Sequence, residues 1–222
     1  MGYKIALFRD DDTETPVCDF LIQQPTYPGY ARAVNYLVWE VMDRDPQAEW
    51  FVFGGDDVLP DPKHPADLIA EECREYFWTQ HIMAPGLRPI DLGARTFGVM
   101  QPTGDKWGDK DGPYIERVAG SAWVGREFCK RIYQGKGPLW PEYFHMFVDQ
   151  ELQEVATKHG VFWQRPDLIH FHQHWGRPRE GERIGQADRM PGFLKEANSG
   201  TRWNQGQREF EDRKAAGFPG SL

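Results

Sequence analysis

The sequence has no long hydrophobic run, few cysteines and no excess of positive charge. No apolar stretch approaches the roughly 20 residues of a membrane-spanning helix, and the first residues lack the pattern of a signal peptide. The three cysteines, Cys18, Cys73 and Cys129, are far apart and odd in number, which argues against a disulfide framework or zinc knot. The net charge of −8 argues against a general nucleic-acid coat or a basic membrane-surface protein. We therefore expect a soluble cytoplasmic protein.

Aromatic residues, in contrast, are plentiful. The 222 residues include nine Trp, eight Tyr and fourteen Phe, while the hydrophobic share of 40% is ordinary for a globular domain. Large rings bury much apolar surface, so they predict a stiff packed core. Alternatively, some of these rings line a groove that binds a sugar or a nucleic-acid base.

The hydrophobic pattern alternates between short apolar runs and stretches of helical spacing. Strands are predicted over residues 3–8, 17–22, 50–53, 95–100, 114–118, 161–163 and 168–174, and helices over 30–44, 65–77, 125–133 and 149–159. This alternation predicts an α/β fold, a mostly parallel sheet flanked by helices. We expect one domain over residues 1–176 and a C-terminal arm over 177–222, with one short helix near 207–216.

The sharpest motif is W-F-V-F-G-G-D-D, which ends in Asp56 and Asp57 directly after a predicted strand. In an α/β sheet, ligands lie at the carboxyl ends of strands. Carboxylate oxygens suit Mg²⁺ or Mn²⁺, and glycines let a bulky ligand approach the backbone. A simple strand-to-helix turn, in which Gly and Asp are common, is the alternative.

Three histidines at a spacing of two, His170, His172 and His174, form the second motif. Alternate residues of a strand share a face, so the pattern predicts that all three point the same way and that at least one binds a metal. We rank His172 first because it is central. The alternative is a solvent-exposed edge strand whose histidines hydrogen-bond to water.

Two helix starts also carry candidate residues. Asp149 is either an ordinary N-cap or a general base at the start of a helix. The segment Pro28–Asn35 opens a helix behind a Gly/Pro loop, and its N-terminus with Arg32 could receive a phosphate.

Taken in order, these motifs resemble a known enzyme family over about residues 27–176. G-Y-A-R-A-V-N, W-F-V-F-G-G-D-D-V-L-P-D-P, V-A-G-S-A-W-V-G, F-V-D-Q-E-L and I-H-F-H-Q-H-W-G resemble the GT-A-fold glycosyltransferases, in particular the large inverting family with many bacterial and phage members. The sequence departs from a strict D-x-D motif, whose first aspartate would fall at Gly54 or Gly55.

The resemblance implies a role for each matching residue. Asp56 and Asp57 would hold Mn²⁺ or Mg²⁺ against the diphosphate of a nucleotide-sugar, and one of the three histidines would complete the metal shell. Asp149 would deprotonate the acceptor hydroxyl. Residues that would contact the donor are Tyr27, Arg32, Asn35, Asp56, Gly120 and Ser121.

The expected function is therefore metal-dependent transfer of a sugar, with inversion, from a UDP-sugar or similar donor. The acceptor hydroxyl could belong to a glycan, a metabolite, a protein or a modified DNA base, in a bacterial or phage-infected cell. Two alternatives stay open: a metal-dependent hydrolase that uses His170, His172 and His174, and a non-catalytic nucleotide-sugar-binding module.

Overall fold

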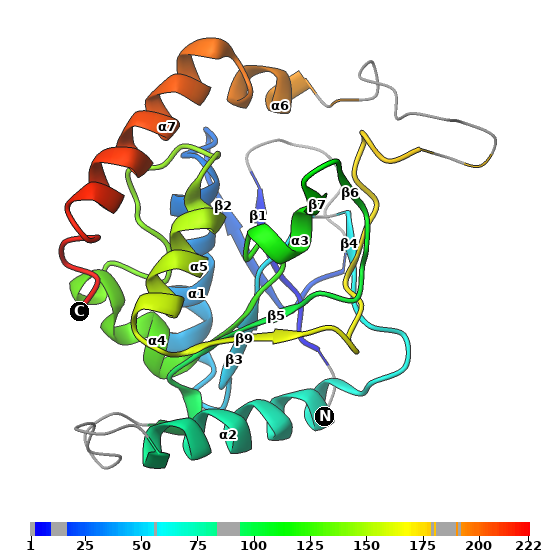
Figure 1. The fold of residues 1–222 in the computed structure, drawn as a ribbon, viewed down its shortest axis with the longest axis vertical. Helices are drawn as coiled ribbons and strands as arrows, with labels where there is room; N and C mark the ends of the chain where they lie inside the picture. Colours follow the sequence, from blue (N-terminus) through cyan, green and yellow to red (C-terminus); the bar gives the residue numbers. More distant parts are fainter. Residues whose placement is uncertain are drawn as a thin grey trace.

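The computed structural model describes residues 3–9, 17–55, 57–83, 94–178, 180, 190 and 192–222. They form a single compact α/β domain (Figure 1). The strands are β1 (Ala6–Arg9), β2 (Phe20–Gln23), β3 (Trp50–Val52), β4 (Val58–Leu59), β5 (Val99–Pro102), β6 (Gly108–Asp109), β7 (Gly112–Pro113), β8 (Trp123–Gly125), β9 (Phe162–Arg165) and β10 (Phe171–His172). The helices are α1 (Tyr30–Arg44), α2 (Ala66–Met83), α3 (Tyr114–Arg117), α4 (Arg126–Arg131), α5 (Val148–Lys158), α6 (Gly192–Ala197) and α7 (Gly200–Ala215).

The central sheet is mixed, in contrast to the mostly parallel sheet that we expected. Its strand order is β3-β8-β5-β9, in which β8 is antiparallel to both neighbours and β5 is parallel to β9. It follows that β3, β5 and β9 run in one direction and β8 alone runs against them. Parallel β1 and β2 form a separate pair, and β4 pairs with β10.

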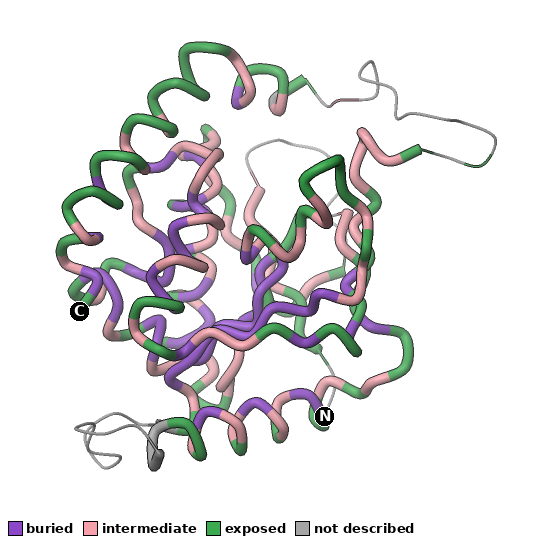
Figure 2. The backbone as a smooth tube through the Cα atoms, in the orientation of Figure 1, coloured by how far each residue is buried: buried purple, intermediate pink, exposed green. Residues whose placement is uncertain are grey.

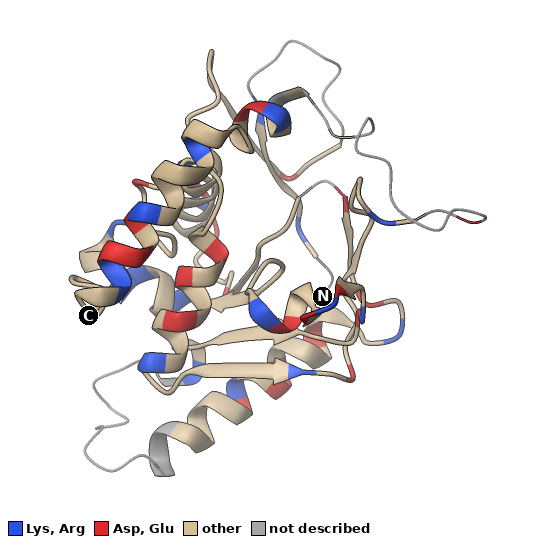
Figure 3. Ribbon diagram, turned by 45° about the horizontal axis from the view of Figure 1, so that its top comes forward, with Lys and Arg blue, Asp and Glu red and all other residues tan. Residues whose placement is uncertain are grey.

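The sheet lies between α2 on one face and α1 with α5 on the other (Figures 1 and 3). The Tyr76 ring of α2 stacks on Trp163 of β9 with ring centroids 4.0 Å apart, and Phe77 stacks on Trp50 of β3. Figure 2 shows that burial concentrates in the strands and in the helix faces that meet them. The aromatic residues therefore build much of the core, as their number predicts.

Helix α1 spans residues 30–44 as predicted. Ala31, Val38 and Val41 are buried on one face, and Asp45 caps the end before Pro46. Helix α5 is also close to prediction, and Gly160 follows its end with a φ of +68°, a conformation that glycine adopts at little cost.

The strand predicted over residues 114–118 is wrong. These residues form the short helix α3 directly after Pro113. Its backbone carbonyl at Glu116 accepts hydrogen bonds from the Gln153 and Gln164 side chains, at 3.3 and 3.0 Å. Contacts to α5 and β9 therefore override the weak strand preference of the segment.

The C-terminal segment contains a longer helix than the one we expected, because α7 covers residues 200–215 and packs against α5. Buried Arg213 of α7 pairs with buried Glu151 of α5, with Nη2 and Oε1 2.7 Å apart. The Tyr143 hydroxyl also donates to Glu151, at 2.7 Å. Figure 3 shows further charged residues spread along α7.

Candidate functional site

The segments that carry the candidate residues meet at one end of the central sheet, the end at which β3, β5 and β9 finish; this end is called the strand edge below. Because β3, β5 and β9 share a direction, the chain leaves all three strands at the same edge. Antiparallel β8 enters at that edge, directly after the loop that holds Gly120 and Ser121. This edge is where α/β sheets place ligands.

The decisive contact joins Asp57 to His172, 115 residues further along the chain. His172 Nε2 lies 3.1 Å from Asp57 Oδ2, and both side chains are about one-third exposed. The backbone fixes this pair, because His172 is opposite Val58 in the β4–β10 ladder and the Gln173 N–H donates to the Asp57 carbonyl at 2.7 Å. The hydrogen bond from His172 holds the pKa of Asp57 below its usual value.

Asp56, the other carboxylate of the motif, lies outside the described residues. The neighbouring glycine has a visible role, since a Cβ at Gly55 would lie only 2.6 Å from Asp57 Oδ1. Glycine at this position leaves room for the Asp57 carboxylate to turn toward His172.

His174 lies next to His172, with ring centroids 5.0 Å apart. Its Nδ1 accepts a hydrogen bond from the Gly176 N–H at 3.0 Å. Burial and the neighbouring His172 lower the pKa of His174 to about 4, so the ring is neutral at pH 7. A neutral ring that accepts at Nδ1 carries its proton on Nε2, which leaves no free lone pair there for a metal.

His170 is placed differently from the other two histidines. It is buried, and its Nε2 accepts a hydrogen bond from Trp123 Nε1 at 3.3 Å. Burial lowers the pKa of His170 to about 4. The strand pairing of this segment covers only residues 171–172, so the spacing of two does not align the three rings on one strand face.

Asp149 lies in the first turn of α5, and the N-cap position belongs to Phe147. Its Oδ1 accepts the Gln150 N–H at 3.0 Å, and a Cβ at Gly120 would lie 3.7 Å from Oδ2. Burial raises the pKa of Asp149. Burial raises the pKa of Tyr30, and the charges of Asp149 and Asp57 raise it further.

The remaining donor candidates make structural contacts. Asn35 is buried and bridges Leu139 through both ends of its amide, at 2.8 and 3.1 Å. Arg32 donates to the Pro141 carbonyl at 3.0 Å. Buried Ser121 is bound by the Gln101 amide, at 3.1 and 3.3 Å. The Tyr27 ring packs edge-on against Phe144, with centroids 5.7 Å apart.

Sequence reasoning missed the residues that secure the histidine segment. Arg177 forms an ion pair with Asp105 and donates to the His172 carbonyl at 2.8 Å. Its guanidinium lies over the Trp107 ring, 4.9 Å from the centroid, and Trp107 also packs against His174. Asp105 and Trp107 stand in a polar loop with no local signal of such contacts, and only their types favour an arginine partner.

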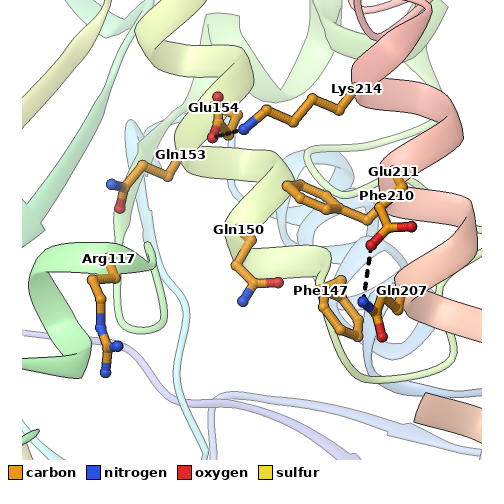
Figure 4. A pocket seen from close by; sticks show the side chains of 9 residues that line it. All are labelled: Arg117, Phe147, Gln150, Gln153, Glu154, Gln207, Phe210, Glu211 and Lys214. Atoms are coloured by element: carbon orange, nitrogen blue, oxygen red, sulfur yellow. Dashed lines mark hydrogen bonds and ion pairs between the residues drawn. The ribbon is translucent and has the colours of Figure 1, made fainter. Parts of the chain in front are cut away.

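Within the described part of the chain, no three His, Cys, Asp or Glu side chains gather in a way that would hold a metal ion. Two hollows lie beside α7, one of them between α5 and α7 (Figure 4). Among the described residues, no helix is long and apolar enough to cross a membrane.

We compared the chain with models of protein families, with curated proteins and with solved structures, and no match was found. The assignment of a function therefore depends on the residues of this site.

Proposed function

We propose that this protein is a metal-dependent glycosyltransferase with a GT-A-like fold, which transfers a sugar with inversion from a nucleotide-sugar, in particular a UDP-sugar. The observation that carries the proposal is the contact of Asp57 with His172 at the strand edge. Residues of these types, so far apart in sequence, are expected to meet there if the resemblance to the sugar transferases is correct.

Asp57 and His172 fit a divalent cation. Two neighbouring ligands of an octahedral ion with bonds of about 2.1 Å are roughly 3 Å apart, and the Nε2–Oδ2 separation is 3.1 Å. Mg²⁺ and Mn²⁺ commonly take one or two protein ligands and fill their shell with phosphate oxygens and water. The bound ion would supply charge neutralisation for the leaving nucleoside diphosphate.

The tautomers of the other two histidines direct the metal role to His172. His170 Nε2 accepts from Trp123, and His174 Nδ1 accepts from the Gly176 backbone. Each of these rings has its one lone pair committed to a protein donor, whereas His172 Nε2 faces the Asp57 carboxylate, where a metal ion would take the place of the shared proton. This arrangement also disfavours a hydrolase that would need all three imidazoles at one metal.

Asp149 is the proposed general base. Its raised pKa makes the ionised carboxylate a stronger proton acceptor than an ordinary aspartate. In the proposed reaction the acceptor oxygen forms a bond to the anomeric carbon as the bond to the diphosphate breaks, and the hydroxyl proton passes to Asp149. A single displacement of this kind inverts the anomeric configuration.

A screen of UDP- and GDP-sugars, with and without Mn²⁺, tests the function. We expect release of a nucleoside diphosphate that depends on the metal, and its loss in Asp57→Ala. Exposed Asp43 on α1 offers a matched control, Asp43→Ala, which should retain activity. The proposal is wrong if Asp57→Ala turns over the donor as fast as the wild type, or if binding occurs with no turnover of any donor.

A further inference from the structure

The backbone of His172 is bound on both sides of its strand. On one side β10 pairs with β4, and the Gln173 N–H donates to the Asp57 carbonyl at 2.7 Å. Because neighbouring residues of an antiparallel strand direct their peptide groups to opposite sides, the N–H and C=O of His172 point away from β4. Among the strands that the structure describes, β10 has no second neighbour. The peptide groups of His172 therefore need partners from outside the sheet.

Asp105 and Arg177 supply these partners and also bind each other. The His172 N–H donates to Asp105 Oδ2 at 3.3 Å, and Arg177 Nε donates to the His172 carbonyl at 2.8 Å. Arg177 Nη2 donates to the same Asp105 oxygen. The three residues thus form a closed ring of hydrogen bonds. The ion pair, called the Asp105–Arg177 clip below, occupies the place that a further strand would take beside β10.

The clip is itself held firmly. Its two side chains are mostly buried, and the Trp107 N–H donates to the second Asp105 oxygen, Oδ1, at 3.3 Å. The Arg177 guanidinium lies over the rings of Trp107 and Phe171, 4.9 and 4.4 Å from their centroids. Arginine presents several donors in a fixed planar fork, which the single ammonium group of lysine does not reproduce. The geometry of the clip is therefore specific to arginine.

The contact of His172 with Asp57 does not hold itself in place. Both side chains are about one-third exposed, and an exposed pair of this kind contributes little to stability. The pairing of β4 with β10 is also short, because each strand contributes only two residues, and such a pair is marginally stable on its own. The position of the His172 ring therefore depends on further contacts of its backbone.

We propose that Asp105 and Arg177 are positioning residues, which hold the His172 backbone so that its imidazole faces Asp57 before any ligand binds. They act through the two peptide groups of His172. Partners that orient a metal ligand typically change the affinity for the metal 10–100-fold. If the proposed function holds, and this step alone rests on it, the clip also sets the affinity of the site for Mg²⁺ or Mn²⁺.

NMR of the imidazole nitrogens of His172, in the metal-free protein at pH 7, tests the inference. Asp57→Ala supplies the reference spectrum of a His172 ring without its carboxylate partner. Arg177→Lys keeps the charge but loses the fork, so its His172 signals should move from the wild-type values toward those of Asp57→Ala. Arg117→Lys is the matched control, because Arg117 also forms an ion pair, with Asp109 at 3.2 Å, and also lies over an aromatic ring.

Asp105→Asn is the second variant. It should move the His172 signals in the same direction, because the neutral amide no longer pairs with the charge of Arg177. Circular dichroism identifies loss of fold, and either variant decides the question if the other fails to fold. The inference is overturned if the folded variants keep the wild-type His172 signals, or if Arg117→Lys moves these signals as far as Arg177→Lys does.

Calorimetry of Mn²⁺ binding separates this inference from the proposed function. Arg177→Lys should weaken Mn²⁺ binding about 10–100-fold, whereas Arg117→Lys should leave it unchanged. If the NMR signals move but the wild type binds no Mn²⁺, the positioning role stands and the proposed metal site is wrong. If the signals move and Arg177→Lys binds Mn²⁺ as tightly as the wild type, the role of the clip in metal binding is overturned.

Discussion

Replacement of Arg213 with Met should destabilise the protein strongly. The Arg213 guanidinium makes three contacts of 2.7–3.0 Å with Glu151, and the two side chains are 7% and 1% exposed. Removing one partner of a buried pair leaves a buried charge and costs about 3–5 kcal/mol. For a chain of this size, each kcal/mol corresponds to roughly 2–4 °C, so the melting temperature should fall by about 6–20 °C.

The assay is urea and thermal unfolding followed by circular dichroism. Lys214→Met is the matched control, because the neighbouring Lys214 forms an exposed pair with Glu154 that contributes only about 0–1 kcal/mol. The double variant Arg213→Met with Glu151→Met removes both charges and should recover part of the loss. If Arg213→Met stays within about 1 kcal/mol of the wild type, the reasoning on this buried pair and on the docking of α7 is refuted.

Three further predictions concern single side chains. Asp149→Asn should lower the rate of sugar transfer about 10²–10⁴-fold. The variant should be as stable as the wild type or more stable at pH 7, because burial raises the Asp149 pKa and penalises the ionised form. Wild-type activity should fall as the pH drops through that raised pKa, and an unchanged rate in Asp149→Asn would contradict the role of Asp149 as general base. His172→Ala should weaken Mn²⁺ binding in calorimetry and His170→Ala should not, although it should lower the melting temperature; equal losses of affinity would contradict the assignment. Burial alone would raise the pKa of Asp61, but hydrogen bonds from the Ile169 N–H and from the turn after Asp61 outweigh burial, so the pKa lies below its usual value. The stabilisation from ionised Asp61 is therefore present above about pH 3.9 and fades as the pH falls below it. Urea unfolding of Asp61→Ala should show a free energy of unfolding that falls less steeply in acid than that of the wild type, and an identical acid dependence would contradict this.

Local patterns in the sequence were sufficient for the main helices. The apolar spacing in residues 30–44 and the Asp45-Pro46 stop predicted α1, and Gly160 marked the end of α5. These signals depend on neighbours in sequence, so they are visible without the fold.

Features that depend on distant contacts could not be predicted. The direction of β8, the helical form of α3 and the burial of His170 each depend on partners far away in sequence. The histidine segment is the clearest case, because a spacing of two implies a shared face only along a paired strand. The ion pair of Asp105 with Arg177 helps to hold this segment in a conformation that is not a regular strand, and no local sequence pattern predicts that ion pair.

The most direct test of the account is a calorimetric titration of UDP into the protein, once with Mn²⁺ and once with a chelator. GDP serves as a second probe in parallel titrations. The wild type should bind a nucleoside diphosphate only with the metal, and Asp57→Ala and His172→Ala should each lose this binding while Asp149→Asn retains it. Binding of equal strength with the chelator, or unchanged binding by Asp57→Ala, would contradict the claim that Asp57 and His172 hold a metal against the diphosphate.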